Sequence, residues 1–264
     1  METFLRRYPD SWDWLLAQAG GLVKLAELAA TEKNAGAAER FTTAIRSLEA
    51  LQAKDPQNLH TLSLLGFTLT GLGQTLIERQ STDEALRQLQ RSASIYTALL
   101  TKDPDNIAWG NQLVESLARI SQIQIEREQY GEAESNLARC VKTSNHLVSR
   151  HPDTVPSLLA ASTCQSRLAL LVASRDDEDS VWFAAHTELT ILRAQIAALA
   201  PEDPSRQDEW RVARDVLVDN LAKSNAPNQN VTAQRLRSAG LALQTTLPEA
   251  AAMLRSLGVE VGRK

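Results

Sequence analysis

The sequence has few cysteines, few aromatic residues and no block of basic residues. Its 264 residues include two cysteines, which excludes a disulfide-rich scaffold. Aromatic residues make up 5% of the chain while alanine and leucine are abundant, which favours helices over sheets. The net charge is −4, so the electrostatic footprint of a nucleic-acid-binding protein is missing. We therefore expect no nucleic-acid partner.

Long apolar runs are also missing. No stretch approaches ~18 consecutive apolar residues, so membrane insertion is not expected. The opening "METFLRRYPDSWDW" lacks the basic region and apolar run of a secretory signal. A chain with 43% hydrophobic and 23% charged residues has the composition of a folded protein. These features predict a cytoplasmic protein.

Prolines recur at a nearly constant interval. Successive members of one series are separated by 47, 48, 48 and 49 positions: Pro9, Pro56, Pro104, Pro152 and Pro201. A fixed period of this size is typical of solenoids. Between the prolines, apolar residues recur at steps of three and four, which predicts two amphipathic helices of about 20 residues per repeat. The expected fold is all-α, with about ten helices in five hairpins, forming a single solenoid over 1–264. The predicted repeats are 9–55, 56–103, 104–151, 152–200 and 201–247, and 248–264 forms a C-terminal cap or tail.

Two kinds of break separate the helices. In "TKDPDNIAW" (101–109), Asp103 is expected to end one helix, and Asp105 or Asn106 to cap the next. Trp109 shares its repeat position with Trp14, so we predict that it packs between hairpins. Within a repeat, short polar segments mark the turn between the first and the second helix. The predicted turn positions are Ser81 or Thr82, Gly131, and 176–179.

No set of residues indicates catalysis, a cofactor or a metal. Four histidines are scattered without zinc-ligand spacing, and "DDED" (176–179) lacks the spacing of a calcium loop. Gly66, Gly71 and Gly73 lie within a helical pattern, which favours close helix packing or a bend over a phosphate-binding loop. We expect a protein that is not an enzyme and that needs no cofactor and no metal.

The two cysteines, Cys140 and Cys164, are about half a repeat apart. One falls in the middle of a second helix and the other in the middle of the next first helix. We predict that both face the same interhelical layer, as small buried apolar groups rather than as reactive thiols.

The repeat resembles the tetratricopeptide repeat (TPR) family. The resemblance rests on the turn "QYGEA" (129–133) and on two small–bulky–small runs, Ala133, Leu137, Cys140 and Ala85, Leu89, Ser92. The usual repeat has about 34 residues. The additional residues here add about two turns to each helix, which keeps the same face inward. The sequence is therefore similar to long-helix repeats with a period of about 48 residues, as in multidomain bacterial signalling and conflict proteins.

The resemblance is specific over 56–151 and weakens after 201, where Pro201 and Pro204 compete for the register. At the other end, "FLRRYPD" (4–10) is similar to "LLTKDPD" (99–105), the end of a second helix. This predicts that the chain opens inside a repeat and belongs to a longer protein. A capping repeat that begins in this way is the alternative.

The resemblance implies a right-handed superhelix whose concave groove is lined by the first helices. It implies a scaffold that binds a peptide or a partner helix there. The alternative is a sensor or regulatory array of a larger bacterial signalling protein, whose effector domain is expected to lie outside this chain. For Phe67 we expect one of two arrangements: the ring contacts a partner, or it is buried against a neighbouring first helix. The groove candidates are His60, Ser63, Phe67, Thr70, Asn111, Glu115, Arg119, Thr163 and Arg167.

Overall fold

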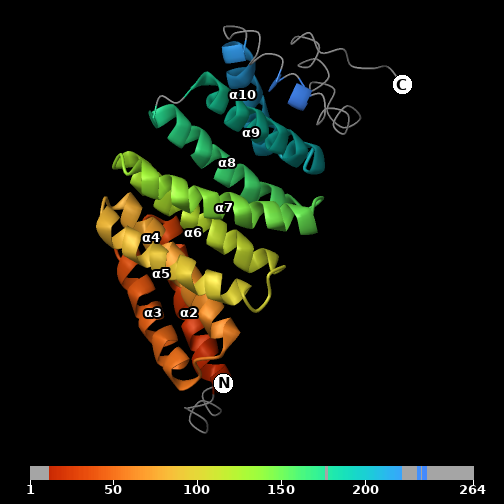
Figure 1. Ribbon diagram of the computed structural model, residues 1–264. Helices are drawn as coiled ribbons and strands as arrows, with labels where there is room; N and C mark the ends of the chain where they lie inside the picture. Colours follow the sequence, from red (N-terminus) through yellow and green to blue (C-terminus); the bar gives the residue numbers. More distant parts are fainter. Residues whose placement is uncertain (1–11, 176–177, 222–230, 233, 237–264) are drawn as a thin grey trace. The chain divides into compact units, whose positions relative to one another are not determined.

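The computed structural model describes residues 12–175, 178–221, 231–232 and 234–236. Within these ranges the named elements are helices throughout, which confirms the prediction of an all-α helical repeat array (Figure 1). The helices are α2 (Trp12–Thr31), α3 (Ala37–Lys54), α4 (Leu59–Glu78), α5 (Thr82–Leu100), α6 (Ile107–Glu126), α7 (Tyr130–Arg150), α8 (Val155–Arg175), α9 (Asp179–Leu199) and α10 (Pro204–Leu221). The chain divides between Ile123 and Gln124 into two compact units, unit 1 and unit 2. Most of α6 belongs to unit 1.

In unit 1 the hairpin of α4 and α5 is antiparallel and tightly packed. A Cβ added at Gly66 would lie 2.8 Å from the ring of Tyr96, and one at Gly73 would lie 2.7 Å from Leu89. The Tyr96 hydroxyl also donates to the backbone oxygen of Ser63, at 2.8 Å. Contacts that advance along α4 while they recede along α5 define an antiparallel pair. The predicted role of these glycines in close helix packing is confirmed.

Three of the turns between a first and a second helix, those before α3, α5 and α7, share one backbone conformation. Lys33, Gln80 and Glu128 have φ angles of 53°, 60° and 58°. Each follows the end of a first helix, and successive members lie one repeat apart in the sequence. The prediction of Gly131 as a turn residue is wrong, because α7 already begins at Tyr130. A single left-handed residue closes each helix here, as in a helix C-terminal motif, without glycine.

Asparagines begin the first helices that follow Pro56 and Pro104. The Asn58 Oδ1 accepts from the backbone N–H of Thr61 at 3.0 Å, and the Asn106 Oδ1 accepts from that of Trp109 at 3.1 Å. Of the two predicted caps, Asn106 therefore takes the role. The Trp109 indole N–H donates to the Ser63 Oγ at 3.1 Å, which joins α6 to α4. The predicted packing of Trp109 between hairpins is confirmed.

In unit 2 the helices α7 to α10 pack in chain order. The Tyr130 hydroxyl donates to the backbone oxygen of Ser174 at 3.2 Å, next to a buried cluster of Ile125, Ala133, Leu137 and Leu171. Farther along, Trp210 of α10 is buried against Ala194 and Ala197 of α9. The helix α10 begins at Pro204, three residues after Pro201, as α8 begins three residues after Pro152.

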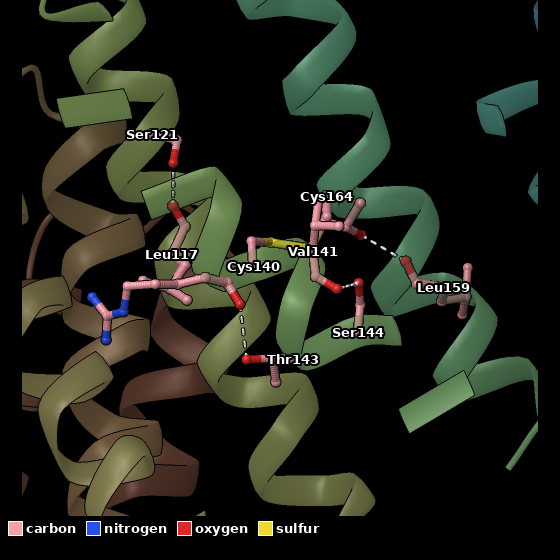
Figure 2. The surroundings of a disulfide bond; sticks show 10 residues. Leu117, Ser121, Cys140, Val141, Thr143, Ser144, Leu159 and Cys164 are labelled. Carbon is pink, nitrogen blue, oxygen red and sulfur yellow. Dashed lines mark hydrogen bonds between the residues drawn. A yellow bond between two sulfur atoms is a disulfide. The ribbon is translucent and has the colours of Figure 1, made fainter. Parts of the chain in front are cut away.

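The cysteines lie in the layer that the sequence predicted, but their chemical state differs. Cys140 of α7 and Cys164 of α8 are fully buried and form a disulfide bond, with their Cα atoms 5.7 Å apart (Figure 2). The prediction that both cysteines are buried in one interhelical layer is confirmed, whereas the prediction that they are small apolar groups missed the bond between them. Helical periodicity brought the two positions together, and two sulfurs at that separation can bond.

Among the described residues, α8 is long and apolar enough to cross a membrane by length and composition. An 18-residue window within it has a mean hydropathy of 1.3, and 50% of that window is buried inside the structure. It packs against α7 on one side and α9 on the other, as the core helix of a helical array does. The predictions for 4–10, for 176–177 and for 248–264, and part of the predicted repeat 201–247, lie outside the described residues.

Candidate partner-binding face

Neighbouring helices of unit 1 cover much of α4, which packs against α3 and α5 and also contacts α2. Gly66 and Gly73 face α5, whereas Gly71 faces α3, where an added Cβ would lie 2.7 Å from the Phe41 ring. Ser63 and Thr70 face α6 through Trp109 and Ser116. Because successive residues are rotated by about 100°, one arc of α4 remains between Thr70 and Gly71. Phe67 lies on this arc.

Phe67 is half-buried. Its exposure lies between the two predicted outcomes, which were contact with a partner and burial against a neighbouring first helix. One turn earlier, Ser63 is also half-buried and holds Trp109. His60, at the start of the helix, is exposed. The three side chains follow one another at steps of three and four, so they share one side of α4.

Thr70 lies inside unit 1 rather than on its surface. It is 8% exposed, and its Oγ1 is 2.8 Å from the Ser92 Oγ and 3.2 Å from the Ser116 Oγ. Three residues beyond Phe67, it is rotated by about 60° toward α6. The repeat contained a signal for this position, because the residue one repeat later is Ala118, which is also buried.

On α6 the predicted residues Asn111, Glu115 and Arg119 are all half-buried and spaced by four. Arg119 forms an ion pair with Glu115 along the helix. Among the described residues, the Arg119 Nε and the Asn111 Oδ1 are buried without a hydrogen-bond partner. The row is therefore polar, partly covered and held in place by its own ion pair.

Sequence reasoning missed Gln74, which lies two turns after Phe67. Its Nε2 donates to the Glu78 Oε1 at 2.7 Å, while its Oε1 is buried without a partner in the part of the chain that the structure describes. A step of seven from Phe67 predicts this position directly. On α2, Lys24 occupies the repeat position of Arg119 and pairs with Glu27 at 2.8 Å. The first-helix face of unit 1, defined by Phe67, Gln74, Glu115 and Arg119, thus combines one aromatic ring with paired polar groups.

The remaining candidates, Thr163 and Arg167, lie on α8 in unit 2. Both are half-buried and one turn apart. The Thr163 Oγ1 donates to the backbone oxygen of Leu159 at 2.9 Å. Thr163 also precedes Cys164, so the disulfide bond fixes the backbone directly beside it. These two residues form a separate set in unit 2.

Titratable groups provide little chemistry in the described ranges. No group of three or more His, Cys, Asp or Glu side chains is placed there to hold a metal ion. His186 of α9 stacks on the Trp182 ring, with centroids 3.7 Å apart. Burial lowers the pKa of His186, against the opposing effect of its contact with the Trp182 backbone oxygen. This histidine is a packed surface residue in unit 2 and lies on a different element from the candidate face.

Comparisons with known proteins give a limited result. No protein-family profile and no curated protein sequence matches the chain. The crystal structure of TTC0263, a thermophilic TPR protein in Thermus thermophilus, is similar at 15% sequence identity with a TM-score of 0.38. That match covers 83% of this chain and 98% of the other chain. The function of this chain is therefore inferred from its own residues.

Proposed function

We propose that this protein is an interaction scaffold and that the first-helix face of unit 1 binds a peptide or a helix of a partner protein. Phe67 is the observation that carries the proposal. It is a large aromatic side chain that stays partly exposed, on the arc of α4 between the contacts with α6 and α3. Exposed aromatic anchors of this kind dominate many protein interfaces.

The polar surroundings of Phe67 suit a partner that also presents charge. Glu115 and Arg119 form a partly buried ion pair on the neighbouring first helix. Arginine in such a position contributes strongly to interfaces, because its planar group can bond a carboxylate and stack on a ring. The proposal keeps His60, Ser63 and Asn111 as flanking positions and omits Thr70, because its hydroxyl is committed to the core.

A displayed peptide library, selected on the full chain, tests the proposal. We expect the selected peptides to lose roughly tenfold or more in affinity when Phe67→Ala or Arg119→Ala is introduced, as for interface anchors. Ser94→Ala, at an exposed position on α5, is the control and should leave affinity unchanged. Peptides that bind all these variants equally would show that the face is not the binding site.

Glu115→Gln tests whether Arg119 recognises a carboxylate of the partner in addition to pairing with Glu115. The substitution removes the negative partner and keeps the shape, so Arg119 becomes free to pair with an acidic residue of the peptide. If the arginine recognises a carboxylate, acidic peptides bind this variant more tightly than the unchanged protein.

If the array belongs to a larger signalling protein, the same face is where its effector domain docks, and Phe67→Ala alters the activity of that domain.

A further inference from the structure

The disulfide-bonded positions have counterparts in the preceding repeat. Cys140 lies one repeat after Ser92, and Cys164 lies one repeat after Ser116. The same interval separates the prolines at which these repeats begin. The pair of cysteines therefore occupies the junction between a second helix and the next first helix, at the place that a pair of serines occupies one repeat earlier.

At the serine junction, hydrogen bonds connect the helices. The Ser116 Oγ donates to the Ser92 Oγ at 3.1 Å, joining α6 to α5. The Ser92 hydroxyl in turn bonds the backbone oxygen of Gly66 at 2.9 Å, and Thr70 contacts both serines. This junction is a buried network of hydroxyl groups whose members all have partners.

At the cysteine junction, one covalent bond connects the helices. Cys140 and Cys164 are both 0% exposed, and Figure 2 shows the sulfur atoms meeting between α7 and α8. Thiols are weak hydrogen-bond donors and acceptors, so a reduced pair cannot replace the serine network. The reduced junction would therefore keep its packing and lose the strong connection between the two sulfurs.

We propose that Cys140 and Cys164 form a buried redox latch, whose oxidation fixes α8 against α7 and whose reduction loosens unit 2 alone. In the oxidising step, a low-molecular-weight disulfide such as oxidised glutathione accepts two electrons. One cysteine thiolate first forms a mixed disulfide and releases one glutathione thiol. The second thiolate then displaces the other glutathione, so that two thiols leave for each protein disulfide formed. Because both sulfurs are buried, either direction requires the α7–α8 junction to open.

Hydrogen exchange on the full chain tests the latch. The oxidised protein is compared with protein that has been reduced in denaturant and refolded without oxygen. We expect faster exchange in α7 and α8 after reduction, with the serine junction of α5 and α6 unchanged before Ile123. The thermal transition of unit 2 should fall by roughly 5–10 °C, as for the loss of a disulfide that closes a loop of this length. Equal exchange in α7 and α8 in both states would overturn the proposal.

A double variant, Cys140→Ser with Cys164→Ser, is the matched control. It copies the side chains of the serine junction, and its exchange should no longer respond to a reducing agent. If the exchange of this variant still rises on addition of a reducing agent, the response does not come from the cysteine pair and the latch is excluded.

Thiol counting tests the chemistry separately. Refolded, reduced protein incubated with oxidised glutathione should lose both thiols without keeping a glutathione adduct. Low denaturant should speed the reaction, since the junction must open. Two persistent free thiols, or a stable glutathione adduct, would contradict closure of the bond.

Discussion

Glycines occur in α4 and in α2 in different surroundings, and an added methyl group distinguishes them. Gly73 faces Leu89, whose Cγ would lie 2.7 Å from a new Cβ. Gly21 is exposed, and apart from its chain neighbours and the backbone of its own helix no atom of the described residues lies within 4 Å of its Cβ position. At Gly73 the missing side chain makes room for the second helix, whereas at Gly21 it only lowers helix propensity.

The substitution Gly73→Ala should lower the free energy of unfolding by about 1–3 kcal/mol, because the branch point of Leu89 must shift in a packed core. Its control, Gly21→Ala, should raise the same quantity by up to ~1 kcal/mol, because alanine is the better helix former. Urea unfolding followed by circular dichroism measures both. A stabilising effect at both positions would show that α4 and α5 are not in close contact.

His186 gives the stability of unit 2 a dependence on pH. Its pKa is lowered by burial, so the folded state binds the proton less readily than the unfolded state. The contribution of the neutral His186 ring to the free energy of unfolding is therefore fully present above the unfolded pKa of about 6.5. It is lost as the pH falls through the folded pKa. His186→Phe keeps a ring against Trp182 and removes the titration. The difference in thermal midpoint between the two proteins should change below about pH 6.5 and stay constant above it; a constant difference throughout would refute this.

At the scale of the helix, asparagine caps mark where the first helices α4 and α6 begin. Asn106 accepts from the Trp109 N–H, whereas Ser81, before α5, makes no side-chain capping bond within the described ranges. Asn106→Ala should therefore lower the free energy of unfolding by about 1 kcal/mol, and Ser81→Ala should have almost no effect. Thermal unfolding of the two variants measures the difference. Equal losses would mean that the side-chain bond at Asn106 does not decide where α6 begins.

The helices were largely predictable because their breaks have distinct chemistry. Proline with a capping asparagine marks the joint between hairpins, as Asn58 and Asn106 show. The turn inside each hairpin was harder to predict. Its left-handed residue is Lys33, Gln80 or Glu128, and none of these side chains favours positive φ. Gly131 was the residue that sequence favoured for this role, and it lies inside α7.

Across the whole molecule, the repeat register predicts which residues share a side of a helix, and it predicts their neighbours less well. Phe67 on α4 is half-buried, as are Glu115 and Arg119 on α6. Thr70 is buried because the adjacent first helix, α6, covers its side of α4. The register placed Cys140 and Cys164 in one layer. Whether two sulfurs in one layer bond depends on a separation of a few ångströms, which periodicity alone does not specify.

The division into two units predicts that a core defect stays local. Leu69 in unit 1 and Leu171 in unit 2 are buried leucines on first helices. Each leucine-to-alanine change should destabilise its surroundings by about 2–5 kcal/mol, through lost burial and the cavity left behind. In a helical repeat array the elements contact mainly their neighbours, so such a loss passes only to adjacent helices. Hydrogen exchange should therefore rise in α4 and α5 for Leu69→Ala, with α9 and α10 unchanged. Leu171→Ala should have the reverse effect, raising exchange in α7 to α9 and sparing α3 and α4. If either variant raises exchange uniformly along the chain, the two units unfold as one cooperative body.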